Sequence, residues 1–205
     1  VLIKRIYHLP HTFQILVTLG IALIIQEASV LIWGPVGKNI AVPPELRGVL
    51  ILGDFIYPYY RLFLIGFAAL IGLGLWLLLE RTRFGALVRA GSESTETVSL
   101  LGTNIFRLFS LTFALGVGLA GVAGVLFAPL RGAQPFVGPE ILGIAFVVVV
   151  IGGMGSFSGA LVGGLLVGVV QSLMTTLWPQ GASLMIYGAM AVVILVRPYG
   201  LFGRA

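Results

Sequence analysis

Long runs of apolar residues constrain this chain more than any other feature of its sequence. Such runs cover residues 13–33, 62–79 and 105–130, and each is close to the length that a membrane-spanning helix requires. A helix needs about 20 mainly apolar residues to cross the hydrocarbon core of a bilayer. Inside that core every backbone polar group must be bonded within the protein, and a helix achieves this by itself. We therefore expect an all-α, polytopic membrane protein.

The composition also indicates that lipid surrounds most of the chain. Hydrophobic residues make up 59% of the 205 residues and charged residues only 9%, against about 25% charged in a typical soluble domain. Disorder is excluded because disordered segments are polar and poor in branched and aromatic residues. The 29 glycines suit membrane helices, in which glycine is common. Cysteine is absent, so the chain has no disulfide, thiolate metal site or cysteine nucleophile.

The second half of the chain is less regular but equally apolar. Residues 141–178 would form a helix about 57 Å long, far more than the core thickness of about 30 Å. The glycine-rich stretch GGMGSFSG at 152–159 must therefore break it, which leaves apolar segments at 141–151 and 160–178. A further apolar segment follows the break PQGA and covers 183–196. We expect about six transmembrane helices, two of them short, with one short glycine-rich helix break.

The basic residues favour one orientation. If the chain begins in the cytoplasm, eight basic residues fall in inside segments and four in outside loops. The inside set is Lys4, Arg5, Arg81, Arg83, Arg89, Arg107, Arg197 and Arg204, and the outside set is Lys38, Arg47, Arg61 and Arg131. Cytoplasmic loops carry an excess of Lys and Arg, so we expect both termini inside. The net charge of +5 has the same explanation, and we expect no nucleic-acid partner.

Residues for catalysis or metal binding are scarce. His8 and His11 flank Pro10, but no third metal ligand stands nearby, so they are better explained as part of a basic segment at the membrane interface. Glu27 is the acidic residue placed within a span, and it lies near the end of that span, where a carboxylate costs less than at the bilayer centre. We predict no catalytic site, no metal site and no cofactor.

The segment 80–104 is the most polar part of the chain. Ser92 is a candidate N-cap, and the acidic residues that follow it would face the positive end of a helix. Gly102 is a plausible stop, and Asn104 or Thr103 would cap the next span. We expect a helix of about ten residues, polar at its start and apolar at its end. Such a helix suits either docking of another protein or an interfacial position on the membrane.

Small residues recur at four-residue spacing, which places them on one face of a helix. The sets are Gly116, Ala120 and Gly124; Gly159 and Gly163; and Ala160, Gly164 and Gly168. Missing side chains let two helix backbones approach closely. Alone, this spacing predicts helix association in the membrane and nothing more specific.

Several of these segments, taken in order, resemble segments of one known family. ERTRFGALVRAGSESTETVSLLGTNIFRLFSLTFALG, GLAGVAGVLFAPL, VVVVIGGMGSFSGALVGGLLVG and VRPYGLFGR together resemble the LivH-type permease subunits of branched-chain amino acid ABC importers. FQILVTLGIALIIQ near the start is similar to the same type. The resemblance covers essentially the whole chain, and residues 80–164 are its most specific part. It implies one transmembrane permease domain over 1–205, and because family proteins begin earlier, it implies that this chain is incomplete at its N-terminus.

The resemblance also implies partners. Family members pair with a second related permease, two ATP-binding cassette subunits in the cytoplasm, which bind the ATP, and an extracytoplasmic substrate-binding protein. The segment 80–104 would be the cytoplasmic coupling loop that contacts the ATPase, although it resembles the Glu-Ala-Ala loop of other importers only loosely. The candidate coupling residues are Arg89, Glu93, Glu96, Leu101 and Gly102.

The glycine-rich break is the other candidate site. Its residues would form a tight helix break and line the translocation path, or serve close packing alone; they are Gly152, Gly153, Gly155, Ser156, Gly159, Gly163 and Gly164. Irregular backbone at membrane depth is tolerated where protein buries it or where it faces a water-filled cavity. Both alternatives are compatible with the sequence.

The resemblance implies a permease for leucine, isoleucine or valine in the inner membrane of a bacterium or archaeon. The permease itself would not be an enzyme, since ATP hydrolysis belongs to the partner subunits. Three alternatives stay open: the same machine carrying urea or short amides, an autonomous channel or ion-coupled carrier, and a structural membrane subunit without a transport path.

Overall fold

The computed structural model describes residues 11–52, 55–100, 102–153 and 155–203. Six residues named above lie outside the described residues: Lys4, Arg5, His8, Pro10, Leu101 and Arg204. The side chain of His11 lies outside them as well.

Six apolar helices dominate the part of the chain that the structure describes. They are α2 (His11–Trp33), α3 (Tyr59–Arg81), α6 (Ile105–Arg131), α7 (Val137–Gly152), α8 (Phe157–Leu177) and α9 (Ala182–Val196). By length and composition α2, α3, α6 and α8 can each cross a membrane, whereas α7 and the apolar part of α9 are shorter. The prediction of an all-α polytopic membrane protein with two short helices is confirmed.

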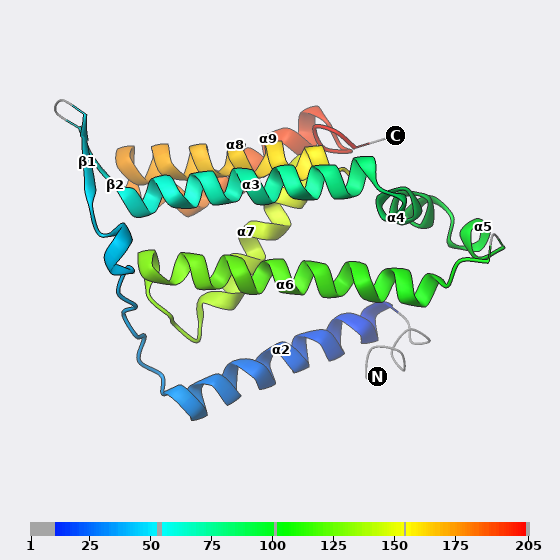
Figure 1. The fold of residues 1–205 in the computed structure, drawn as a ribbon, viewed down its shortest axis with the longest axis horizontal. Coiled ribbons are helices and arrows are strands. Elements are labelled where there is room, and N and C mark those ends of the chain that lie inside the picture. The colour runs from blue at the N-terminus through cyan, green and yellow to red at the C-terminus, as the bar shows by residue number, and fades with distance from the viewer. Residues whose placement is uncertain (1–10, 53–54, 101, 154, 204–205) are drawn as a thin grey trace.

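The six helices alternate in direction between two ends of the molecule (Figure 1). The start of α2, the end of α3 and the C-terminal residues lie at one end, on the right of the view. Two short helices, α4 (Arg83–Glu93) and α5 (Thr95–Leu100), lie at this same end and join α3 to α6. We call this the α4–α5 end. The connections from α2 to α3 and from α6 to α7 lie at the opposite end.

The buried core lies between the last three helices. Val147 and Ile151 of α7 are fully buried and pack with Val167 of α8 and Ile186 of α9. Elsewhere the helices expose large apolar side chains, such as Leu31 of α2 at 85% and Val125 of α6 at 74%. Apolar surface of this extent is expected where lipid is the solvent, because lipid and aliphatic side chains are equally apolar.

The connection 34–60 is not the plain loop that its glycines and prolines suggest. It contains a short 3₁₀ helix, η1 (Pro44–Leu46), and an antiparallel hairpin of β1 (Val49–Leu52) and β2 (Phe55–Pro58). The strand pairs run from Val49 opposite Pro58 to Leu52 opposite Phe55. The sequence signal was present, since two β-branched and aromatic runs are separated by Gly53-Asp54 alone. A second 3₁₀ helix, η2 (Pro179–Gly181), stands at the predicted break before α9.

The helix expected at 92–102 is wrong in its bounds. The polar segment instead folds into α4 and α5, and Ser92 is the penultimate residue of α4 rather than an N-cap. Its hydroxyl donates to the carbonyls of Val88 and Arg89. Two other residues supply the hydroxyl oxygens that accept backbone N–H groups at these two helix starts, Thr82 from Gly85 and Ser94 from Thr97.

Candidate functional site

Helix α4 is held firmly against both long helices that it connects. At Gly85, a side chain would collide with the backbone of Leu79 at the end of α3. At Gly91, an added Cβ would lie 3.5 Å from Leu108 and 3.8 Å from Phe109, both of α6. Both glycines are buried. Helix α4 is therefore in close backbone contact with α3 at Gly85 and in van der Waals contact with side chains of α6 at Gly91.

Arg89, a predicted coupling residue, contributes to this attachment. Its guanidinium forms an ion pair with Glu80 at 3.4 Å and donates a hydrogen bond to the carbonyl of Leu79. Both partners lie in the last turn of α3, whose final carbonyls have no partner within the helix. Arg89 therefore links α4 to the last turn of α3, a contact that its position in the sequence did not indicate.

Helix α5 is anchored at both of its ends. Val98 is buried at 2% exposure, and the Ser94 hydroxyl accepts the N–H of Thr97 at 3.2 Å. Gly102 has φ of +80°, and its N–H donates to the carbonyl of Ser99 at 3.0 Å. A positive φ favours glycine, so Gly102 ends the helix as expected. Asn104 then caps α6 by accepting the N–H of Arg107 at 3.1 Å, as predicted.

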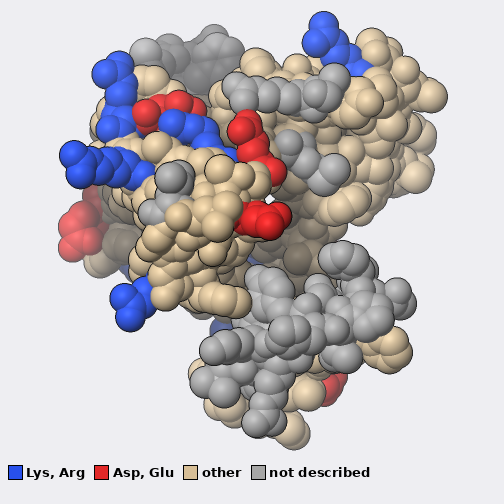
Figure 2. All heavy atoms as spheres, turned by 90° about the vertical axis from the view of Figure 1, so that its right-hand side faces the viewer, with Lys and Arg blue, Asp and Glu red and all other residues tan. Residues whose placement is uncertain are grey.

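The exposed surface of this segment combines charge with one large apolar group. Glu93 and Glu96 are exposed, and Leu100 is 83% exposed at the end of α5. Figure 2 views this end directly and shows basic and acidic side chains gathered over one part of it. Leu101, the predicted apolar contact, lies outside the described residues, whereas its neighbour Leu100 supplies an apolar group that the sequence analysis did not select. We call Glu93, Glu96 and Leu100 the docking face.

The glycine-rich break is a tight connection between α7 and α8. Helix α7 ends at Gly152, and the next two described glycines, Gly153 and Gly155, have φ of +98° and +84°. The Ser156 hydroxyl then caps α8 by accepting the N–H of Gly159 at 3.0 Å. The predicted helix break is therefore confirmed.

Close packing explains most of the remaining glycines. Any side chain at Gly152 or Gly159 would collide with the backbone of the other, and a Cβ at Gly163 would lie 2.8 Å from the carbonyl oxygen of Val148. At Gly164 the space is less tight, with Val148 3.7 Å away. These contacts give the four-residue spacing of Gly159 and Gly163 its expected packing role. The role of the break in a translocation path stays a prediction.

The C-terminal segment packs onto this break, which the sequence analysis did not foresee. The N–H groups of Leu201 and Phe202 donate to the carbonyls of Ile151 and Gly152 at 2.9 and 3.0 Å. These are carbonyls of the last turn of α7, which lack partners within the helix. Gly200, with φ of +80°, lies so close to Gly153 that a side chain would collide with it. The motif RPYGLFG thus packs against one side of the helix break.

The small-residue face of α6 has no such partner. Gly116, Ala120 and Gly124 are all exposed, and a Cβ added at either glycine would meet nothing within 4 Å. Within the part of the chain that the structure describes, this stripe therefore packs against no other helix.

Comparison with known proteins gives a consistent result. Residues 8–195 match the protein family described as "Branched-chain amino acid transport system / permease component". The chain is 33% identical over 194 residues to the branched-chain amino acid permease protein BraD of Pseudomonas aeruginosa, covering 91% of this chain and 62% of BraD. It is 30% identical over 195 residues to LivH of Salmonella typhimurium, again with 91% and 62% covered. It is also 32% identical over 128 residues to LivM of Escherichia coli, covering 60% of this chain and 29% of LivM.

The chain thus spans 62% of the length of the BraD and LivH relatives that it matches. No solved structure matches it. The family match covers far more than half of the chain and includes the six apolar helices except the last residue of α9, the α4–α5 segment and the glycine-rich break. This multi-pass membrane protein therefore belongs to the family of branched-chain amino acid transport permease components.

Proposed function

We propose that this chain is a transmembrane permease subunit of an ATP-driven importer for leucine, isoleucine and valine. One observation carries the proposal: similarity to permeases named for branched-chain amino acid transport extends over 91% of the chain. The relatives described above are named for branched-chain amino acids rather than for urea, amides or ions, which favours this cargo over the alternatives.

The proposed assembly contains a second related permease, two ATP-binding subunits and an extracytoplasmic substrate-binding protein. The chain is similar to relatives named LivH and to relatives named LivM, which supports the pairing of two related permeases. The open small-residue face of α6 supports it as well, because such a face lets a helix of another subunit approach closely.

We place the α4–α5 end in the cytoplasm, in the inner membrane of a bacterium or archaeon. The start of α2, helices α4 and α5, and the C-terminal residues share this end (Figure 1). The sequence assigns eight of the twelve basic residues to this side, as the positive-inside rule requires. Both termini of the chain are then cytoplasmic, and the hairpin of β1 and β2 is extracytoplasmic.

The permease performs no bond chemistry in this mechanism. ATP binding and hydrolysis occur on the partner subunits, and the closing of the two ATPases displaces the docking face. Because α4 contacts α3 through Gly85 and Arg89 and contacts α6 through Gly91, we propose that this displacement is passed on to both long helices. A rigid-body movement of this kind switches the pore between inward-open and outward-open states.

The glycine-rich break has a second role in this proposal. The break lies where α7 ends and α8 begins, and Gly155 is exposed with nothing within 4 Å of an added Cβ. Backbone groups at such a position can line a water-filled path. Gly152, Gly159 and Gly163 then hold the two helices together while the path opens beside them.

Reconstitution of the complete transporter tests the proposal. Proteoliposomes with both permeases, both ATPases and the loaded binding protein should accumulate labelled leucine with ATP and fail to do so with ADP. Liposomes that contain this chain alone should accumulate none. Uptake by the chain alone would indicate a channel or carrier, and uptake of urea without leucine would assign the other cargo; either result contradicts the proposal.

A further inference from the structure

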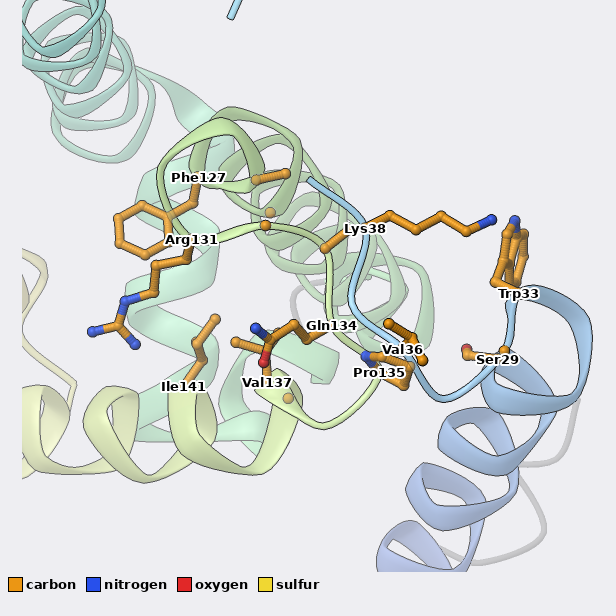
Figure 3. Close-up of a pocket in the computed structure, with 16 residues that line it drawn as sticks. Ser29, Trp33, Val36, Lys38, Phe127, Arg131, Gln134, Pro135, Val137 and Ile141 are labelled. Carbon is orange, nitrogen blue, oxygen red and sulfur yellow. The ribbon is translucent and has the colours of Figure 1, made fainter. Parts of the chain in front are cut away.

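A cavity of about 510 Å³ opens at the end of the molecule opposite α4 and α5. It lies between the C-terminal end of α2, the segment 34–38, the C-terminal end of α6 and the start of α7 (Figure 3). In the proposed orientation this is the extracytoplasmic side. Pockets of about 300–1,000 Å³ are typical of small-molecule sites, and this one is large enough for an amino acid with several waters.

Specific backbone contacts build one wall of the cavity. The N–H of Lys38 donates to the carbonyl of Ala133, and the N–H of Ala133 donates to the carbonyl of Lys38, both at 2.9 Å. Gly132 has φ of +78°, and a Cβ there would lie 3.3 Å from the carbonyl oxygen of Lys38. The segments 34–38 and 132–134 are therefore pinned together at this point, and α2 is connected to α6 through them.

Apolar side chains supply most of the lining. They come from all four parts of the wall and are Trp33, Val36, Phe127, Val137 and Ile141. Figure 3 shows Ile141 and Val137 on α7 facing the end of α6, and Gln134 between them and the segment 34–38. A branched aliphatic group in this space would replace water against apolar surface, which is favourable.

The charges of the lining are unbalanced. Lys38 and Arg131 line the cavity, whereas no acidic residue does. The Arg131 guanidinium is compensated, because it pairs with Glu140 at 2.6 Å and lies 5.8 Å from the centre of the Phe127 ring. Among the described residues, Lys38 has no ion-pair partner, and its side chain extends toward Trp33. The cavity therefore combines apolar walls with one uncompensated positive charge.

We propose that this cavity is an extracytoplasmic loading site for an amino acid with a branched aliphatic side chain. The Lys38 ammonium attracts the carboxylate, and the apolar walls receive the side chain. This inference rests on the proposed function and deepens it by locating the first contact of the cargo with the permease. An anionic lipid shares this chemistry, with a negative group on an apolar body, and the experiment below distinguishes the two.

The probe is a leucine analogue that carries a photoreactive diazirine in its side chain. It is applied to the complete transporter in nanodiscs, with its binding protein, and adducts are mapped by mass spectrometry. We expect adducts within 29–38 and 124–141 that unlabelled leucine suppresses. Adducts confined to other segments would overturn the inference. Suppression by anionic lipid but not by leucine would also overturn it and assign the cavity to lipid.

Two matched pairs of variants sharpen the test. Lys38→Gln should lower labelling about two- to fivefold, as expected for an exposed charge pair, whereas Lys38→Arg should retain most of it. Ile141→Trp fills the cavity from α7 and should abolish labelling, whereas Leu142→Trp lies on α7 outside the lining and should not. Co-purification of the ATPase confirms that each variant is assembled.

The same preparations distinguish a failure of the loading site from a failure of the proposed function. If the wild-type complex imports leucine but both Lys38→Gln and Ile141→Trp label normally, the loading site is wrong and the proposed function stands. If the wild-type complex imports no leucine, the proposed function fails and the loading site fails with it.

Discussion

Single glycines determine how closely the helices of this protein approach one another. The positions Gly152 and Gly159 face each other across the crossing of α7 and α8, and neither has room for a methyl group. Gly168 lies on the same helix as Gly159, but an added Cβ there would meet nothing within 4 Å. The same residue type therefore has different consequences at two positions of one helix, which only the packing distinguishes.

Gly159→Ala should consequently destabilise the protein by about 1–3 kcal/mol, the usual cost of inserting a methyl group into a close-packed contact. Thermal unfolding of the purified protein in detergent measures this as a lower midpoint. Gly168→Ala is the matched control and should leave the midpoint unchanged or raise it, since alanine favours the helix. Equal midpoints for the two variants would contradict the close contact between α7 and α8.

Arg89 gives a second prediction at this scale. Arg89→Gln removes both the ion pair with Glu80 and the bond to the Leu79 carbonyl, whereas Glu80→Gln removes only the ion pair. The two side chains are 48% and 46% exposed, so the ion pair itself contributes about 0.2–1 kcal/mol. Both variants should lower the leucine imported per ATP hydrolysed, Arg89→Gln more strongly.

The comparison of these two variants separates positioning from direct contact. If Arg89 holds α4 in place, both variants should still co-purify with the ATPase. A loss of co-purification in Arg89→Gln alone would show that the guanidinium binds the ATPase directly, as the resemblance first suggested.

At the scale of helices and strands, the docking face is a surface built from two short helices. Its chemistry is two exposed carboxylates beside one exposed leucine, on a backbone held by Val98 and by the left-handed Gly102. An apolar side chain that is 83% exposed outside the spanning helices is a good candidate for burial by a partner.

Leu100→Ser should therefore weaken ATPase binding by roughly 1–2 kcal/mol, about five- to thirtyfold, without affecting insertion into the membrane. Glu96→Lys should weaken it too, by reversing a charge at the same face. The measurements are co-purification of the ATPase and leucine-stimulated ATP hydrolysis. Ser99→Ala changes an exposed neighbour by one hydroxyl and should behave as wild type. Normal coupling in both Leu100→Ser and Glu96→Lys would exclude this face as the ATPase contact.

The sequence predicted the spanning helices well because their requirement is simple. A run of apolar residues is sufficient for a helix in lipid, and α2, α3, α6 and α8 begin and end within a few residues of the expected limits. Helix α4 was missed for a different reason. Gly85 and Gly91 are poor helix formers, yet a side chain at Gly85 would collide with Leu79 of α3, and Gly91 contacts Leu108 and Phe109 of α6. The contact of Gly91 with Leu108, 17 positions away, leaves no local signal in the sequence.

In the candidate site too, the sequence indicated the residues with local roles but not those whose role depends on distant neighbours. Gly102 and Asn104 have local roles in a turn and a cap, and the sequence identified both, whereas Ser156 was selected as part of the glycine-rich break and not as the cap of α8. Arg89 and Leu100 depend on what lies beside them in space. The hydrogen bonds of Leu201 and Phe202 to α7 join residues about 50 positions apart, so no local pattern could indicate them.

At the scale of the whole molecule, one arrangement underlies the proposed mechanism. The α4–α5 end, with its docking face, lies opposite the cavity formed by α2, α6 and α7. Helix α6 connects the two, since Leu108 near its start packs against α4 and Phe127 near its end lines the cavity. In the proposed mechanism, a force applied at the docking face reaches the cargo on the other side of the membrane through this single helix of 27 residues.

This arrangement requires the docking face and the cavity to be on opposite sides of the membrane, and the chain is well suited to test it. Because it contains no cysteine, Ser99→Cys and Asn39→Cys each introduce the sole thiol of the chain, at exposed positions of the two ends. A membrane-impermeant maleimide should label Asn39→Cys in spheroplasts and Ser99→Cys in inverted vesicles. Detergent should expose both and serves as the control for reactivity. Labelling of Ser99→Cys in intact spheroplasts would put α5 beyond the reach of any cytoplasmic ATPase, and the transmission of force through α4 and α6 would then have no source.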